Sequence, residues 1–368
     1  MQISPRDFLA NVNATTFGKV ITDRTLRRRR AELGGDPAKL DVGSYLSHLV
    51  ERLQAKRARS EVATYDAKKE AARERSAEKS KSGRDIGALP PVVDPERKEA
   101  CRLDLRLYLE TYHADVFVDP WSDDHLEVIA AMQTAISTGG QFALAMPRGS
   151  GKTSLTECAA LWAILYGHRR FVVTIGSDAE AAGQLLESIK SQCEHNDLLL
   201  EDFPEACAPI RALEGIVHRC KGQLYQGEPT AIEWKAKKIV FATIPGTACS
   251  GAIVVARGLT GRIRGLKHIT AAGQSLRPDL AIPDDPQTDE SANSIDQTNK
   301  RERIIFGAVM GLAGPGRSIA VIVPCTIIAH NDLAQRLLDR KRHPEFHGIR
   351  KQLMYAHPTN VGLWEKYF

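Results

Sequence analysis

Short apolar runs alternate with longer amphipathic stretches from about Asp94 to the end of the chain. The apolar runs have the length and composition of buried strands, and the clearest are Phe142–Met146, Phe171–Ile175, Ile239–Ile244, Leu280–Ile282 and Ile319–Val323. Between several of them apolar positions recur at helical spacing, notably in Ser154–Tyr166 and Ala179–Cys193. Strands that alternate with helices form a mostly parallel sheet that helices cover. The pattern therefore predicts an α/β domain at residues 94–368.

The residues ahead of this domain divide into two zones. Two helix-like stretches, near Asp23–Leu33 and Asp41–Arg59, predict a small helical module of residues 1–59, and in the second stretch apolar positions recur at helical spacing. Charged and small side chains dominate the next stretch, which buries too little apolar surface to form a core. We therefore expect a charged linker or a solvated helix at residues 60–93.

The first predicted helix carries a run of arginines, Arg27 to Arg30. Leu26 and Leu33 would face a partner helix while these arginines meet DNA phosphates, as in small helix-turn-helix modules. A solvated basic helix, or a docking arm for another protein, fits the same residues. Both interpretations of the module stay open.

Composition and charge limit the classes of partner and the cellular compartment that we expect for this chain. The net charge of +5 and the isoelectric point near 8.8 are mildly basic, which is compatible with a polyanionic partner. The seven cysteines include no C-x-x-C pair, so we expect reduced thiols and no zinc site. The N-terminus lacks a signal-peptide layout, and the longest apolar run, Ile319–Ala329, is shorter than the roughly 20 residues that span a bilayer. We expect a soluble intracellular protein with no membrane contact.

A glycine-rich loop follows the first predicted strand and leads into a predicted helix. Glycines let successive backbone N–H groups point at phosphate oxygens, and the helix N-terminus adds positive potential. Lys152 would reach the β- and γ-phosphates of ATP, and the Thr153 hydroxyl would ligate Mg²⁺. The Walker A pattern G-x-x-x-x-G-K-[S/T] is missed only at its first position, which holds Met146. The alternative is a glycine-rich turn with an incidental lysine.

The predicted nucleotide-binding residues of this loop are consecutive in the sequence. They are Pro147, Arg148, Gly149, Ser150, Gly151, Lys152, Thr153 and Ser154.

Two adjacent acids follow the short apolar run Leu280–Ile282. The carboxyl ends of strands in an open α/β sheet are where ligands bind, so Asp284 and Asp285 are placed to serve the same site. Asp284 would hold Mg²⁺ through water, and Asp285 would be the general base or would orient the attacking water. Glu290 competes with Asp285 for that role. The alternative is a solvated acidic turn, because Asp-Pro pairs commonly start turns.

Several blocks in this order and spacing resemble the ATPase domain of tailed-bacteriophage terminase large subunits, over roughly residues 105 to 368. The blocks are Phe117–His125, Pro147–Thr153, Val172–Ala179, Gly258–Lys267, Arg277–Thr288 and Val323–Thr326. The resemblance implies a RecA/ASCE-like P-loop NTPase fold. It also implies that ATP hydrolysis drives double-stranded DNA into a procapsid in the host cytoplasm.

The resemblance implies roles for individual residues. The segment around Pro120 and Trp121 lies where the family contacts adenine, and Arg148 matches an arginine that senses the γ-phosphate. Asp284 matches the magnesium-binding acid. Asp285 takes the place of a catalytic carboxylate that is often Glu in the family.

Two further roles concern coupling and assembly. Thr326 matches the motif that links the γ-phosphate state to movement against DNA. Arg264, or else Arg262, matches an arginine offered to the ATP of a neighbouring subunit. The resemblance implies a homo-oligomeric ring, a pentamer, at a capsid portal, with the small terminase subunit as a partner.

Family members normally continue into an RNase H-like nuclease domain. This chain ends at Leu363–Phe368, where the connection to that domain would begin, so we expect no DNA cleavage by the chain as given. Two other functions remain possible from the residues. One is a RecA-like helicase or remodelling ATPase, and the other is a DNA-binding adaptor that uses the nucleotide as a switch. A small-molecule kinase ranks last, since it needs no coupling or arginine-rich blocks.

Overall fold

The computed structural model describes residues 83–270, 273–356 and 359–366, with short pieces between 51 and 76. The chain divides into two compact units, residues 1–79 and 80–368. In the first unit the described residues 51–52, 54–55, 67 and 69–76 are helical. The helix expected near Asp23–Leu33, with its arginines, lies outside the described residues, as does most of the helix expected at Asp41–Arg59.

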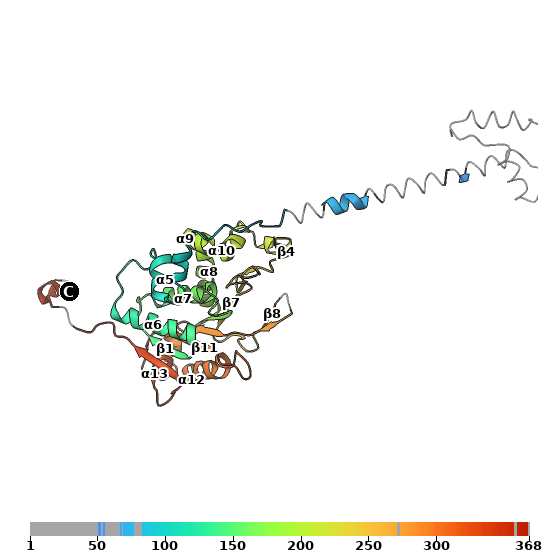
Figure 1. Ribbon diagram of the computed structural model, residues 1–368. Coiled ribbons are helices and arrows are strands. Elements are labelled where there is room, and N and C mark those ends of the chain that lie inside the picture. The colour runs from blue at the N-terminus through green and yellow to red at the C-terminus, as the bar shows by residue number, and fades with distance from the viewer. Residues whose placement is uncertain are drawn as a thin grey trace, which may run out of the picture. The chain divides into compact units, whose positions relative to one another are not determined.

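An eight-stranded sheet forms the centre of the second unit, in the order β12-β1-β11-β10-β2-β7-β6-β5 (Figure 1). Neighbours from β12 to β7 run parallel, while β6 and β5 add an antiparallel hairpin at one edge. The predicted α/β class with a mostly parallel sheet is confirmed. The strands are β1 Gln141–Ala145, β2 Phe171–Gly176, β5 Glu233–Lys235, β6 Lys238–Val240, β7 Ile253–Gly258, β10 Leu280–Pro283, β11 Ala320–Cys325 and β12 Phe346–Arg350.

Helices cover both faces of this sheet (Figure 1). The α-helices are α4 Pro95–Ala100, α5 Leu105–Tyr112, α6 Asp123–Thr138, α7 Lys152–Leu165, α8 Ala179–His195, α9 Asp197–Asp202, α10 Pro204–Arg211, α11 Asp289–Ala292, α12 Ile295–Ile304, α13 Leu333–Leu338 and α14 Val361–Glu365. A 3₁₀ turn spans Val217–Cys220, and a π-helical turn, Ile305–Val309, extends α12. Two small hairpins pair β3 Leu224–Tyr225 with β4 Glu228–Pro229, and β8 His268–Ile269 with β9 Ser275–Leu276.

Alternation along the strands explains the two layers. Neighbouring strand residues point to opposite faces, so Leu144 and Val172 join the core beneath α5 to α8, whereas Ala143 and Val173 join the core beneath α12 and α13. Every position of β2, β10 and β11 is buried, and most of these residues are apolar. This is the composition expected of parallel strands that helices cover on both sides.

Two features of the sheet differ from the sequence prediction. The run Ile239–Ile244 was expected to be one strand, but β6 ends at Val240. The following residues leave the ladder while staying buried, and Phe241 N donates to Ala252 O at 2.9 Å. The strands β7 and β12 were not predicted. Apolar burial alone thus does not separate a strand from a buried irregular segment.

The compact unit takes in residues that composition had assigned to the linker. Ile86 N donates to Leu224 O at 2.9 Å, and Val93 N donates to Glu201 O at 3.0 Å. Asp85 accepts hydrogen bonds from the backbone of Gln226 and Gly227. No helix among the described residues has the length and apolar character to cross a bilayer.

Candidate active site

The glycine-rich loop of residues 147–153, which we call the phosphate loop after its predicted ligand, joins the end of β1 to the start of α7. Gly149 and Gly151 have φ of 78° and 71°, in the left-handed region that residues with a side chain seldom adopt. Ser150 Oγ donates to Pro147 O at 2.8 Å and tightens the turn. No side chain caps the N-terminus of α7, so its first N–H groups are available to an anion.

Met146 explains the departure from the Walker A pattern. It is 3% exposed, and its N–H donates to Cys325 O at 3.0 Å, so the position continues β1 into the core. The turn itself begins only at Pro147. A glycine at position 146 is therefore not needed to form the loop.

The two acids meet the loop at the carboxyl end of β10. Thr153 Oγ1 donates to Asp284 Oδ2 at 3.0 Å, and Lys152 Nζ lies 3.1 Å from Asp285 Oδ2. Asp285 has φ of 36°, which is costly for a residue other than glycine and is characteristic of functional sites. The structure thus brings together four residues that the sequence placed in one site.

Asp284 has the properties of a cation ligand. It is 7% exposed, and its Oδ1 has no hydrogen-bond partner among the described residues. Burial, and then the charge of Asp285, raises the pKa of Asp284 to about 7. A divalent cation at this carboxylate would offset both effects and favour the ionised form.

The residues present fit a magnesium ion that is shared with phosphate. No group of three or more His, Cys, Asp or Glu side chains among the described residues is arranged to hold a metal by itself. Thr153 and Asp284 would supply two oxygen ligands and would leave the remaining positions to phosphate and water. Mg²⁺ in nucleotide sites is usually bound in this way.

Thr326 reaches the site from a third strand. It follows β11, which lies between β1 and β10 in the sheet. Its Oγ1 donates to Asp285 Oδ1 at 3.2 Å. The Asp285 carboxylate is consequently held from two sides, by Lys152 and by Thr326.

Arg148 lies at the rim of the site. Its side chain is 65% exposed and forms an ion pair with Asp289 at the start of α11. Exposed pairs of this kind contribute little to stability, so Arg148 can exchange this partner for a phosphate at small cost. Both side chains border a cavity of about 260 Å³, which is lined by Arg148, Ser177, Asp285, Gln287, Thr288, Asp289, Thr326 and Ile328.

A second cavity, of about 320 Å³, lies on the other side of the loop. It is lined by Ser122, Asp124, His125, Met146, Pro147, Arg148, Gly149, Ser150, Lys351, Gln352, Leu353 and Tyr355. Lys351 Nζ lies 3.0 Å from Asp124 Oδ1, and Tyr355 Oη donates to Asp124 Oδ2 at 2.8 Å. These contacts hold the segment that follows β12 against the start of α6, beside the phosphate loop.

Trp121 and His125 form the link between α6 and the loop. The Trp121 ring packs against Phe117 and His125, with centroid distances of 5.0 and 5.8 Å. His125 Nε2 lies 3.1 Å from Ser150 O, and its Nδ1 lies 2.7 Å from Ser122 Oγ. His125 was not predicted as a site residue, since a single histidine near a helix start gives no sequence signal. Trp121 is half-buried and does not line the cavity, so its contact with adenine remains a prediction.

Two predicted residues do not join this cluster. Glu290 is exposed on α11, and Arg264 is exposed in the loop after β7, beside the buried Ile263. Arg262 flanks Ile263 on its other side and is also exposed. No hydrogen bond or ion pair within the described ranges connects Glu290 or Arg264 to the phosphate loop or to Asp284.

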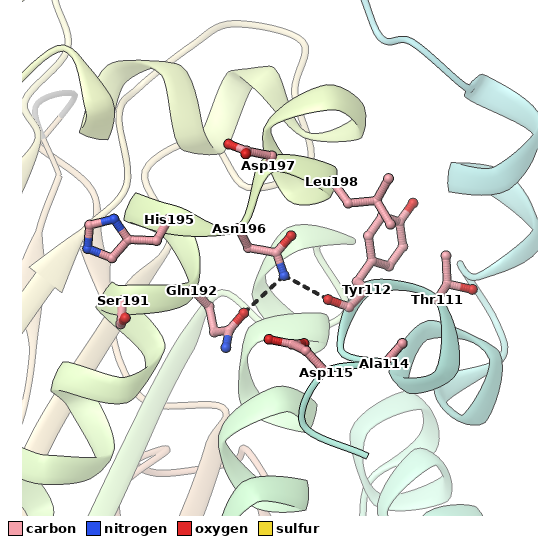
Figure 2. Close-up of a pocket in the computed structure, with 10 residues that line it drawn as sticks. All are labelled: Thr111, Tyr112, Ala114, Asp115, Ser191, Gln192, His195, Asn196, Asp197 and Leu198. Carbon is pink, nitrogen blue, oxygen red and sulfur yellow. Dashed lines mark hydrogen bonds between the residues drawn. The ribbon is translucent and has the colours of Figure 1, made fainter. Parts of the chain in front are cut away.

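A further pocket of about 460 Å³ contains none of the predicted residues (Figure 2). It lies where the C-terminal ends of α5 and α8 meet, and Asn196 Nδ2 donates there to Tyr112 O at 2.7 Å and to Gln192 Oε1 at 3.0 Å. The phosphate loop is near the opposite end of α8, a 17-residue helix and so about 25 Å long. We do not assign this pocket to the nucleotide site.

Comparison with solved structures shows a partial likeness. No family model matches the chain, and no curated protein matches it. Among solved structures, the HK97 bacteriophage large terminase is similar, with a TM-score of 0.37 and 17% sequence identity. The similar region covers 65% of this chain and 41% of that terminase, so the chain spans less than half of its length.

Proposed function

We propose that this chain is an ATPase that binds ATP with Mg²⁺ at the glycine-rich loop and hydrolyses it. The observation that carries this proposal is the convergence of Lys152, Thr153, Asp284, Asp285 and Thr326 at the carboxyl ends of three parallel strands. Phosphoryl transfer to water requires a positive side chain, here Lys152, a metal-ligating pair, here Thr153 and Asp284, and a carboxylate for the water, here Asp285.

Each part has a defined task. The loop N–H groups and Lys152 bind the β- and γ-phosphates, and Thr153 with Asp284 holds the cation. Mg²⁺, when bound, neutralises charge that builds on the phosphate oxygens. Asp285 orients the attacking water and accepts its proton. Lys152 Nζ pairs with Asp285, so a γ-phosphate that takes Lys152 as its partner would free that carboxylate.

Two arginines complete the charge stabilisation. Arg148 exchanges Asp289 for the γ-phosphate, a step favoured by its exposure. Arg264 is exposed and lies outside its own site, so it suits the site of a neighbouring subunit. Arginines supplied in this way are worth roughly 10³–10⁵ in rate in other P-loop enzymes. We propose a homo-oligomeric ring, a pentamer, in which each site lies at a subunit boundary.

We further propose that hydrolysis drives double-stranded DNA into a procapsid in the host cytoplasm, at a capsid portal and with a small terminase subunit. The support is the order of the sequence blocks that resemble terminase large subunits, together with the net charge of +5. Residues 1–59 are the proposed docking or DNA-binding module, residues 60–79 the linker, and the compact unit of residues 80–368 the motor.

A nucleotide switch is the second candidate. It is favoured by Asp285, a shorter acid than Glu that is already held by Lys152 and Thr326. The two functions differ in their response to DNA. We expect double-stranded DNA to raise the ATP turnover of the chain, and Asp284→Ala to abolish both the basal and the stimulated rate. Tight ATP binding with no turnover, with or without DNA, would support the switch instead.

A further inference from the structure

We propose that Gln287 is a positioning residue that transmits changes at Asp285 to the helices α12 and α13. The proposal rests on the ATPase function described above. Gln287 lies two residues after Asp285, is 8% exposed and borders the same cavity.

The Gln287 side chain is a fully paired buried amide. Its Nε2 donates to Thr298 Oγ1 at 2.7 Å and to Ser291 O at 3.1 Å. Its Oε1 accepts a hydrogen bond from Leu333 N at 2.7 Å. A buried amide with all of these bonds made allows little local adjustment, because an unpaired buried donor or acceptor is costly.

These bonds fix both ends of residues 326–333, which we call the relay segment. At its start Thr326 donates to Asp285 Oδ1, and at its end Leu333 donates to Gln287 Oε1. Asp285 and Gln287 belong to one short stretch of backbone. A displacement of that stretch therefore moves both ends of the relay segment together, and with it α13, which begins at Leu333.

The same stretch also contacts α12. Arg301 Nη1 donates to Pro286 O at 2.7 Å, while Gln287 reaches α12 through Thr298. Arg301 is itself 7% exposed. Asp285 thus holds the start of the relay segment, and Pro286 holds α12. Gln287 holds both α12 and the start of α13.

The two helices are joined to each other and so respond as a pair. Arg336 of α13 donates to Glu302 of α12 at 2.8 Å, and both side chains are nearly buried. The π-helical turn Ile305–Val309 directly follows Ile304, the last residue of α12, and such turns are frequent at functional positions. The α12–α13 pair lies on the sheet face opposite α5, α6 and α7 (Figure 1). A change of nucleotide state at the phosphate loop is thereby transmitted, at the carboxyl ends of the strands, to the α12–α13 pair.

The test is a comparison of Gln287→Met with Gln223→Met in the full chain. Methionine keeps the length of the side chain and removes its hydrogen bonds. Gln223 is the matched control, because it is also a buried glutamine, 4% exposed, whose amide pairs with Pro209 O and Thr230 Oγ1 away from the site. Thr298→Val removes the acceptor of one Gln287 bond and serves as a second variant if Gln287→Met does not fold.

We expect Gln287→Met to lower kcat for ATP by about tenfold to a hundredfold, since small displacements of catalytic groups have effects of this size. The affinity for a fluorescent ATP analogue should stay within about twofold of wild type, because the hydrogen bonds of Gln287 go to Thr298, Ser291 and Leu333 and not to the phosphate loop. Gln223→Met should lower the unfolding temperature and leave kcat unchanged. Stimulation by DNA should be lost in Gln287→Met and kept in Gln223→Met.

Two results would overturn the inference alone. One is an active wild type with an unchanged kcat in Gln287→Met and Thr298→Val. The other is an equal loss of kcat in Gln223→Met, which would mean that general stability is responsible. A wild type that does not bind the ATP analogue would instead overturn the proposed function, and the inference with it.

Discussion

Lys152 Nζ lies 3.1 Å from Asp285 Oδ2, so the lysine that should bind phosphate pairs with the acid that should activate water. Lys152 is nearly buried, with its side chain 8% exposed, while that of Asp285 is 42% exposed. The pair compensates the charge of the nearly buried Lys152 ammonium. It also implies that a γ-phosphate that replaces Asp285 as the partner of Lys152 would free Asp285 to activate water in the same step.

The first prediction separates Asp285 from Glu290. Asp285→Asn should lower kcat by about 10² to 10⁴, the usual range for loss of a general base, and leave ATP affinity equal to or tighter than wild type. Glu290→Gln should be close to wild type, because Glu290 is exposed and away from the cluster. Steady-state hydrolysis and analogue binding measure both effects. The assignment is wrong if Glu290→Gln is the inactive variant.

The second prediction concerns magnesium. Asp284→Asn should raise the Mg²⁺ concentration needed for half-maximal ATP turnover by more than about tenfold, because the amide is a neutral and weaker ligand. Thr153→Ser keeps the hydroxyl and should leave that concentration near wild type. A magnesium titration of turnover compares the three proteins. The same midpoint in Asp284→Asn as in wild type would remove Asp284 from the metal site.

The third prediction tests the exchange of partners by Arg148. Arg148→Ala should lower kcat at least about tenfold, since it removes charge stabilisation in the transition state. Asp289→Asn frees the same arginine, and it should keep kcat and raise ATP affinity by at most about fivefold, because an exposed pair contributes little. If Arg148→Ala raises only KM and leaves kcat unchanged, Arg148 binds substrate without stabilising the transition state.

The fourth prediction is a pH dependence of stability from His113. The side chain is fully buried, and burial lowers its pKa from 6.5 to about 4. The folded state therefore binds fewer protons than the unfolded state between these values. Above pH 6.5 His113 should not change the free energy of unfolding. As the pH falls from 6.5 to 4, His113 should lower the free energy of unfolding by about 3 kcal/mol.

Urea unfolding at several pH values checks this contribution. His113→Gln should unfold with a shallower dependence on pH over that window. The matched control is His195→Gln, because the His195 side chain is 76% exposed and lines the pocket of Figure 2 from the end of α8. An identical slope in wild type and His113→Gln would show that His113 does not carry the effect.

The sequence predicts the parts of the candidate site that are local. The phosphate loop needs only a strand, two glycines and a helix start, all of which lie within residues 141–165. Asp284 and Asp285 follow a buried strand, and parallel strands deliver their carboxyl ends to one edge. The contact of Thr153 with Asp284, 131 residues apart in sequence, follows from that rule.

Contacts that depend on tertiary packing have no comparable signal. Arg148 meets Asp289 because the loops after β1 and β10 come together, and Gln287 meets Leu333 because the loops after β10 and β11 do. The strand β12 also gives no clear sequence pattern, since Phe346 is buried while His347 and Gly348 are exposed at the sheet edge. Pairing with β1 decides its conformation, and pairing partners cannot be identified from local propensity.

The central claim is that the loop at residues 147–153 hydrolyses ATP. The most direct measurement is the release of inorganic phosphate from ATP by the full chain with Mg²⁺, beside Lys152→Ala. We expect wild-type turnover that disappears without Mg²⁺ and falls by at least about a hundredfold in Lys152→Ala. Turnover that persists in Lys152→Ala at the wild-type rate would show that this loop is not where ATP is hydrolysed.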